Sequence, residues 1–348
     1  MLKQYGYTED TKPENGLLPA RVTAVHRERY ELAGEDGSLF GKLKTSVYHG
    51  AEDEIFPTAG DFVLFTPVEG GDCQIVETLP RRSYFARSDP DPNGGRQQAV
   101  AANFDTVFIM TSLNRDFSVN RVQRYLVLAR QSGAMPVVVL TKADLTEDFT
   151  EQAAAARAIA GDAEVIPVSA LSGMGLDRLG TYLAPGRTVV FLGMSGVGKS
   201  SLLNAVTGRD VMAVNAIRED DSRGRHTTTH RQLVMLPNGA MVIDTPGMRT
   251  LGMWNADEGL SETFADVEEL FGSCRFSDCR HENEPGCAVK EAVRQGMITA
   301  ERLDNYDKLR RESAYAEKKA YYLQIKRERD KNIALFGKRQ KKNGGIRF

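Results

Sequence analysis

Residues 16–80 carry short apolar runs separated by turn residues. The runs lie at 21–26, 39–43, 61–68 and 74–79, and glycines are frequent between them. Short strands at this spacing predict a small antiparallel barrel. Its size fits an OB-fold, a common platform for nucleic acids, and an SH3-like barrel fits nearly as well.

The pattern changes from residue 103, where apolar strands alternate with helices. Strands are expected at 105–111, 137–140, 164–168 and 188–192. Ser118 is placed to cap a helix that ends near Gly133. Alternation of this kind predicts βα units and a largely parallel sheet.

The last third of the chain begins with a hairpin signal and continues with a helical pattern. Pro237-Asn238-Gly239 separates two apolar runs at 232–236 and 240–243, which predicts a hairpin. After residue 260 we expect helices, including 291–293 and 300–325, interrupted by a cysteine cluster.

The composition is that of a folded globular protein. The chain has 348 residues, 41% hydrophobic and 26% charged, so two or three domains are expected and collagen-like or wholly disordered classes are excluded. No run of about 18 apolar residues occurs, which excludes a transmembrane helix. The first residues lack the profile of a signal peptide, so we expect a cytoplasmic protein.

The net charge of −2 hides an asymmetry. Residues 302–348 hold 15 Lys/Arg against 6 Asp/Glu, whereas the first 301 residues hold 30 against 41. A basic end on an acidic body favours a polyanionic partner such as RNA, although a solvated helix face has the same composition.

A glycine-rich segment after the strand expected at 188–192 is the strongest motif. It matches G-x-x-x-x-G-K-[ST] and precedes a helix expected at 200–206, which is the context that a phosphate-binding loop requires. Backbone N–H groups of such a loop surround phosphates at a helix N-terminus. Lys199 is expected to reach the β- and γ-phosphates, and Ser200 to bind Mg²⁺. The nucleotide-binding residues expected here are Gly193, Met194, Ser195, Gly196, Val197, Gly198, Lys199, Ser200 and Ser201.

Two segments that follow expected strands favour guanine over adenine. One resembles the guanine-reading [NT]-K-x-D motif of GTPases and consists of Thr141, Lys142, Ala143 and Asp144. The carboxylate of Asp144 would accept hydrogen bonds from guanine N1–H and N2–H₂, groups that adenine lacks, while the stem of Lys142 would pack over the base. The other segment resembles the loop whose backbone N–H contacts guanine O6, and it begins with Ser169 and Ala170.

A third segment, 244–247, resembles the D-x-x-G motif and follows the strand expected at 240–243. Asp244 is expected to hold Mg²⁺ through water, and the Gly247 N–H to contact the γ-phosphate. The order of the motifs is unusual, because Asp144 precedes Gly193 by 49 residues and Asp244 follows it by 51. We therefore predict a circularly permuted G domain, in which the segment after Asp244 leads directly into the C-terminal region.

Residues 218–230 are polar and occupy the position of a switch loop. Thr228 or Thr229 is expected to complete the Mg²⁺ shell, and the spacing does not separate them. Met248 stands where many GTPases carry a water-orienting glutamine. We therefore expect slow intrinsic hydrolysis that a partner stimulates. His226 and His230 are candidate water-positioning residues, or they pack or contact RNA.

Three cysteines and one histidine cluster within 14 residues. Four N/S ligands without a spare carboxylate favour a closed, tetrahedral, structural Zn²⁺ site, one per chain. The expected ligands are Cys274, Cys279, His281 and Cys287.

In its motifs and in their order, the chain resembles the RsgA (YjeQ) family of circularly permuted small ribosomal subunit biogenesis GTPases. From the N-terminus, these features are the barrel, TKAD, SAL, GMSGVGKSS, the HTTTH loop, DTPG and the Cys-Cys-His-Cys cluster. The resemblance covers nearly the whole chain. It implies an OB-fold, a permuted G domain and a zinc-binding helical domain. It also implies GTP hydrolysis stimulated by the small subunit, a checkpoint late in subunit maturation, and binding to ribosomal RNA.

We accordingly expect an α/β chain, a permuted P-loop GTPase domain with an all-β barrel before it and a helical domain after it. The expected segments are a flexible N-terminus (1–16), an OB-fold-like barrel (17–84), a linker (85–102), the G domain (103–256), the zinc-binding domain (257–330) and a basic tail (331–348) that orders on a polyanion. We expect a monomer. Two other functions compete: a GTP-regulated switch on another RNA or protein, and a metabolic NTPase or kinase, for which the sequence offers no clear base.

Overall fold

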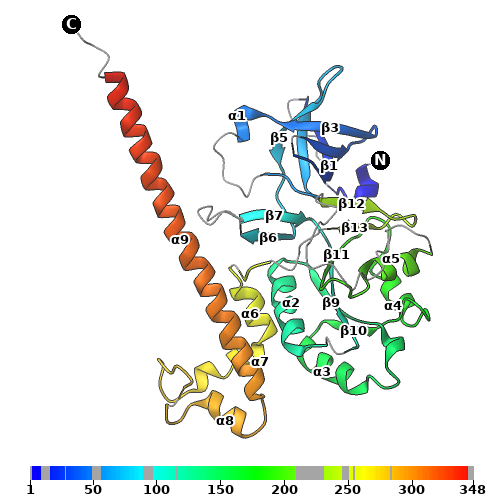
Figure 1. Ribbon diagram of the computed structural model, residues 1–348, viewed down its shortest axis with the longest axis vertical. Coiled ribbons are helices and arrows are strands. Elements are labelled where there is room, and N and C mark those ends of the chain that lie inside the picture. Colours follow the sequence, from blue (N-terminus) through cyan, green and yellow to red (C-terminus); the bar gives the residue numbers. More distant parts are fainter. Residues whose placement is uncertain are drawn as a thin grey trace, which may run out of the picture.

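The computed structural model of the chain combines a barrel, a large mixed sheet covered by helices, and a long C-terminal helix (Figure 1). It describes residues 2–8, 16–27, 29–48, 56–88, 97–114, 117–208, 231–244, 251–253, 255–282 and 284–343.

The first domain is a closed five-stranded barrel, which confirms the expected OB-type architecture. Its strands are β1 (Leu18–Val25), β2 (Tyr30–Ala33), β3 (Ser38–Leu43), β4 (Phe62–Thr66) and β5 (Cys73–Thr78). They are paired in the order β1-β2-β3-β5-β4, and β4 pairs back with β1. Only the β3–β5 pairing is parallel. A short 3₁₀ helix (Leu2–Tyr5) precedes the barrel, and α1 (Thr45–Tyr48) follows β3.

The segment expected as a linker contains paired strands. β6 (Tyr84–Ser88) and β7 (Gln97–Ala102) form an antiparallel two-stranded sheet. Phe85 is buried and stacks on Phe104 at 4.8 Å between ring centroids. This apolar contact anchors the hairpin to the domain that follows, whereas the Arg-, Pro- and Gly-rich composition around it had indicated only a connection.

The second domain is a largely parallel sheet, as the alternating pattern predicts. Its strands are β8 (Thr106–Ser112), β9 (Met135–Thr141), β10 (Glu164–Pro167), β11 (Thr188–Gly193), β12 (Arg231–Met235) and β13 (Met241–Asp244). The spatial order is β10-β9-β8-β11-β13-β12, and only β12 is antiparallel to its neighbour within this domain. β12 also pairs with β1 of the barrel, so the two domains share one eleven-stranded sheet.

Helices cover both faces of this sheet, and the central strand is therefore buried on both sides. Every residue of β8 is buried, as expected of a strand between two helical layers. Val107 and Ile109 pack with α2 (Val119–Gln131) and α3 (Thr150–Ala160). Phe108 and Met110 pack with α4 (Leu176–Gly180) and α5 (Lys199–Thr207). A 3₁₀ turn (Ala143–Leu145) follows β9.

The C-terminal part is helical, as predicted, and packs against α2. It contains α6 (Asp257–Thr263), α7 (Ala265–Glu268), a 3₁₀ turn (Phe271–Ser273), α8 (Ala288–Arg294) and α9 (Ala300–Asn343). Tyr306 and Leu309 of α9 are buried in the same core as α2 and α6. Arg124 of α2 forms a two-pronged ion pair with Glu312 of α9, at 2.5 and 2.7 Å.

α9 is longer than the expected helix at 300–325. It continues to Asn343, so most of the segment expected as a basic tail that orders on a polyanion is already helical. After Pro285 the sequence contains no further proline, and the first glycine pair in this part of the chain is at 344–345, so nothing stops the helix earlier. Figure 1 shows its second half extending away from the body of the molecule. Within the described ranges, no helix combines the length and apolar character that a bilayer crossing needs.

Candidate functional site

Four parallel strands and their connections bring the predicted nucleotide motifs to one edge of the sheet. β9 ends at Thr141, β10 at Pro167, β11 at Gly193 and β13 at Asp244. These strands pair in parallel with their neighbours. β8 pairs with β9 on one side and with β11 on the other, β9 also pairs with β10, and β11 also pairs with β13. Since the carboxyl ends of parallel strands meet at the same edge, the phosphate loop and the guanine-motif residues face one region, where ligands of open α/β sheets bind.

The phosphate loop depends on glycine at the positions where the backbone turns. Gly196 and Gly198 have φ of 74° and 99°, a region that favours glycine. A Cβ on Gly193 would lie 2.8 Å from the carbonyl oxygen of Met110, so the loop leaves β11 against the backbone of β8. α5 begins directly after the loop, at Lys199, and its N-terminal N–H groups favour an anion.

A cavity of about 300 Å³ lies between the two guanine-motif segments and the phosphate loop. The predicted residues around it, with Leu171 of the SAL segment, were found by their motifs, whereas Val168 and Leu202 carry no motif of their own. These apolar side chains suit the faces of a planar base. The cavity is lined by Thr141, Lys142, Asp144, Val168, Ala170, Leu171, Val197, Gly198, Ser201 and Leu202.

The carboxylate of Asp144 is held by Ser169. The Ser169 hydroxyl donates to Asp144 Oδ1 at 2.5 Å, and it accepts from the backbone N–H groups of Leu171 and Ser172. Ser169 is fully buried, so this oxygen has a fixed position. Sequence reasoning assigned this loop only a backbone contact with the base. The side-chain role was missed, because Ser169 and Asp144 are 25 residues apart in the sequence and meet only when β9 and β10 pair.

A hydrogen bond from Thr141 connects the guanine-reading segment to the phosphate loop. Its hydroxyl donates to the Val197 carbonyl oxygen at 2.7 Å, and the residue is buried. On the other side of the segment, the Ala143 N–H donates to the Val168 carbonyl at 3.1 Å. Lys142 between them has φ of 59°, in the left-handed region, where non-glycine residues cluster at functional sites.

Removing the Thr141 hydroxyl is expected to weaken nucleotide binding. In Thr141→Val the Val197 carbonyl loses its donor, and we expect GDP affinity to fall by roughly three- to tenfold, the equivalent of one hydrogen bond. Thr141→Ser keeps the hydroxyl and should bind GDP within about twofold of the unmodified chain. Isothermal titration with GDP measures both variants. Equal affinity in Thr141→Val and Thr141→Ser would contradict this role.

Asp244 stands at the end of β13 in surroundings that fit a cation. Burial raises the pKa of its carboxyl, and the positive charge of Lys199 lowers it. A half-buried carboxylate beside the phosphate loop is stabilised by nearby positive charge, which is the chemistry that a magnesium ligand needs. Ser200 lies in the first turn of α5, next to Lys199. These donors fit Mg²⁺ bound together with a nucleotide.

Several predicted site residues lie outside the described residues. These are the switch-loop candidates Thr228, Thr229, His226 and His230, the γ-phosphate sensor Gly247, and Met248. Their predicted roles stay predictions.

The cysteine–histidine cluster is assembled as expected. The ligand atoms of Cys274, Cys279, His281 and Cys287 all lie within 4.8 Å of one another, an arrangement that can hold a metal ion. His281 Nδ1 lies 3.6 Å from the Cys274 sulfur and 3.5 Å from that of Cys287. The His281 ring stacks on Phe271, and Cys287 caps α8, which fixes both side chains.

Comparison with known proteins identifies relatives of the whole chain. Residues 78–254 match the model of the RsgA GTPase family. The small ribosomal subunit biogenesis GTPase RsgA 2 of Lactiplantibacillus plantarum is 45% identical over 90% of this chain and 90% of its own length. The protein of the same name from Listeria monocytogenes is 44% identical over 95% of this chain and 94% of its own length.

Solved structures agree in fold. The crystal structure of YjeQ from Thermotoga maritima aligns with a TM-score of 0.61 and 30% identity, covering 84% of this chain and 97% of that one. YloQ, described as a circularly permuted GTPase, aligns with a TM-score of 0.57 and 24% identity over 86% of this chain and 96% of its own. The second likeness supports the fold.

Proposed function

Because this chain belongs to the RsgA GTPase family, we propose that it couples its GTP hydrolysis to a late step in the maturation of the small ribosomal subunit. It binds ribosomal RNA with an affinity that depends on the bound nucleotide. The names of its relatives supply the small subunit as partner. We further propose that it acts in the cytoplasm as a monomer.

The convergence of Asp144, Thr141 and the phosphate loop around one cavity is the observation that carries this proposal. Asp144 would accept the two N–H groups that distinguish guanine, and the hydrogen bond from Ser169 holds its carboxylate in place. Gly193–Gly198 backbone N–H groups bind the phosphates, and Lys199 stabilises charge on the β- and γ-phosphates. Ser200 and Asp244 hold magnesium, which neutralises phosphate charge when it is bound.

We propose that hydrolysis is slow without a partner. Met248 offers no group that orients water, so the attacking water is positioned only when the subunit orders the switch loop, with His226 as the candidate and Thr228 or Thr229 at the metal. We expect isolated protein to turn over GTP well below about 1 s⁻¹, the order of a fully activated small GTPase.

We further propose that the C-terminal domain responds to the nucleotide. Leu251 follows the D-x-x-G segment by a few residues, and its carbonyl accepts a hydrogen bond from Arg124 at 3.2 Å. The same guanidinium holds Glu312 of α9. A nucleotide-dependent shift of the chain at Leu251 therefore reaches α9 through one side chain.

The metal of the cysteine–histidine cluster is zinc in this proposal. With Zn–S bonds of about 2.3 Å and Zn–N bonds of about 2.0 Å, tetrahedral ligand atoms lie roughly 3.5 to 3.8 Å apart, close to the sulfur–nitrogen distances here. The metal would supply folding energy and no catalytic position.

Metal analysis tests the zinc assignment. We expect about one zinc per chain, as in other closed four-ligand sites. Cys274→Ala should lose the metal and lower the melting temperature of the C-terminal domain. Cys73→Ala, which removes a buried barrel cysteine outside the cluster, should retain it. A metal-free wild-type chain, or zinc retained equally in both variants, would contradict the assignment.

Sedimentation with isolated ribosomal subunits tests the proposed partner. A non-hydrolysable GTP analogue should retain the chain on the small subunit, and GDP should release it. Absent or nucleotide-independent association would remove the ribosomal proposal. Nucleotide-dependent association with a different RNA or protein would favour the competing view of a GTP-regulated switch.

A further inference from the structure

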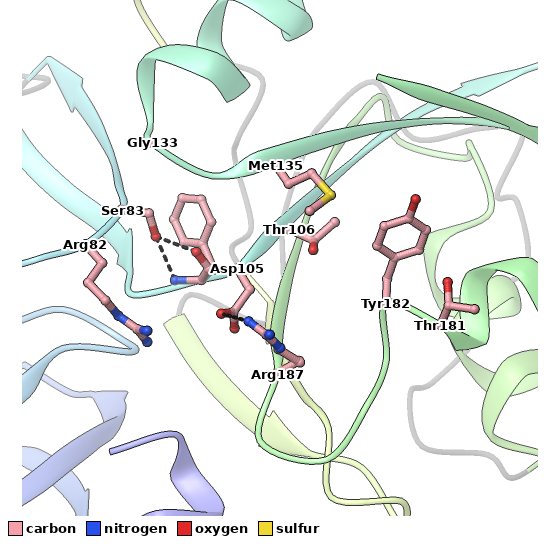
Figure 2. A pocket seen from close by; sticks show the side chains of 10 residues that line it. Arg82, Ser83, Asp105, Thr106, Gly133, Met135, Thr181, Tyr182 and Arg187 are labelled. Carbon is pink, nitrogen blue, oxygen red and sulfur yellow. Dashed lines mark hydrogen bonds and ion pairs between the residues drawn. The ribbon is translucent and has the colours of Figure 1, made fainter. Parts of the chain in front are cut away.

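A second cavity, of about 420 Å³, lies at the opposite end of the parallel sheet from the phosphate loop. Its residues come from the starts of β8 and β9 and from the connection into β11. β8 has seven residues and spans about 20 Å, so the two cavities are separate sites. We call this the amino-end pocket, and its principal residues are Arg82, Asp105, Thr106, Met135, Tyr182 and Arg187 (Figure 2).

Two guanidinium groups give the amino-end pocket a positive side. Arg187 pairs with Asp105 at 2.9 Å, and the other carboxylate oxygen of Asp105 accepts the Thr188 N–H at 2.8 Å. Asp105 is thus occupied by its own neighbours and serves to orient Arg187. The guanidinium of Arg82 has no hydrogen-bond or ion-pair partner within the part of the chain that the structure describes. Burial lowers the pKa of the nearby Arg21, Asp105 raises it, and the charge of Arg82 lowers it by a smaller amount.

The other side of the amino-end pocket carries an aromatic ring and a thioether. Figure 2 places Tyr182 across the Asp105–Arg187 pair from Arg82, with Met135 above it. The Tyr182 ring meets Phe108 edge-on at 5.9 Å between centroids, and its hydroxyl donates to Glu164, so the ring is held rigidly. Met135 is 57% exposed, although it is apolar. An aromatic ring beside a polarizable thioether is a surface on which a nucleic-acid base stacks.

We propose that the amino-end pocket binds one unpaired nucleotide of an RNA strand, with the phosphate between Arg82 and Arg187 and the base against Tyr182 and Met135. The inference deepens the proposed function and rests on it, since RNA is the partner in both. The Thr106 side chain lines the same pocket and offers a hydroxyl to the base or ribose.

Exposure of the charged side favours a polymer over a small free nucleotide. The Arg187 side chain is 62% exposed, and Arg82 is also exposed, so the phosphate would lie at the rim. A phosphate at the rim lets an RNA chain enter and leave while one base occupies the cavity. A site for a free phosphorylated metabolite would enclose its charged end, because burial strengthens the ion pairs that hold it.

Fluorescence anisotropy of the full-length chain with a labelled, unstructured RNA of about ten nucleotides tests this site. Arg82→Gln and Arg187→Gln should each weaken binding by roughly five- to tenfold, as expected when a charged hydrogen bond is lost. Each should also lower the slope of log K against log salt by about 0.7, one phosphate contact. The matched control Arg157→Gln removes an exposed arginine from α3 and should stay within about twofold. GTP affinity should be unchanged in all three.

Cross-linking gives a readout that does not depend on charge. RNA containing 4-thiouridine should cross-link to Tyr182 or Met135, as located by mass spectrometry, and Arg82→Gln should reduce that yield. Equal affinities in Arg82→Gln, Arg187→Gln and Arg157→Gln, or cross-links elsewhere only, would overturn the pocket. Competition by micromolar free nucleoside monophosphate would assign it to a soluble nucleotide instead. If these tests fail while the chain still sediments with the small subunit, the proposed function stands without this site.

Discussion

Asp144→Asn is expected to weaken GTP binding by roughly 10²- to 10³-fold and to make xanthosine triphosphate the better ligand. The carboxylate would accept two N–H groups of guanine, and an amide presents a donor to one of them, so a charged hydrogen bond is lost and a repulsive contact replaces it. Xanthine carries a carbonyl oxygen at that position and restores the pairing. Competition of GTP, ATP and xanthosine triphosphate for a fluorescent nucleotide measures the change.

Asp177→Asn is the matched control for this prediction. Asp177 is an exposed carboxylate in the first turn of α4 and lies outside the guanine cavity, so its loss should leave nucleotide preference as it is. Ser169→Ala should lower GTP affinity and keep the preference for guanine, because it frees the Asp144 carboxylate without removing it. An Asp144→Asn variant that still prefers GTP would refute the assignment of the base-reading residue.

Arg21→Met is expected to destabilise the chain by about 3 to 5 kcal/mol, the largest loss of stability that we predict. Arg21 lies in β1 and is 1% exposed. Its guanidinium donates to the carbonyl oxygens of Tyr5, Gly60 and Asn103, which come from the N-terminal turn, the barrel and the start of the G domain. Burial lowers the pKa of this guanidinium, and the negative charge of Asp105 opposes that shift.

Methionine retains the apolar stem of Arg21 but removes the donor to the Tyr5 and Asn103 carbonyls, and the Gly60 carbonyl keeps only the hydrogen bond from the Asn103 side chain. Thermal unfolding followed by circular dichroism measures the loss, with Arg27→Met as the control, since Arg27 lies just after the same strand and is exposed. A melting temperature for Arg21→Met equal to that of Arg27→Met would show that the contact between the barrel and the G domain does not depend on the Arg21 guanidinium. Because Arg21 connects the barrel to the G domain, we also expect Arg21→Met to unfold in separate transitions, one for the barrel and one for the sheet.

The sequence predicted the parts of the fold that have strong local signals. The buried strands of the G domain, the helix capped by Ser118 and the Pro237–Gly239 hairpin all occur where the apolar pattern placed them. The nucleotide motifs could be assigned because each combines an unusual residue set with a strand end. Their meeting at one edge follows from the parallel pairing of the strands that carry them.

Features that depend on distant contacts were not predictable. β2 has only four residues and gave no apolar run, and it forms because β1 and β3 pair with it on both sides. The β6–β7 hairpin depends on the burial of Phe85 against Phe104. Arg21 stands in a strand pattern like any other polar residue, and its burial appears only when barrel and sheet meet. The hydrogen bond between Ser169 and Asp144 joins residues 25 apart in sequence.

A crystal structure of the chain with GDP and Mg²⁺ tests most directly whether the permuted segments form a single guanine site. We predict that the diphosphate lies in the loop from Gly193 to Ser200 and that both oxygens of Asp144 lie within hydrogen-bond distance of guanine N1 and N2. A diphosphate in that loop with its purine turned away from Asp144 would contradict the central claim.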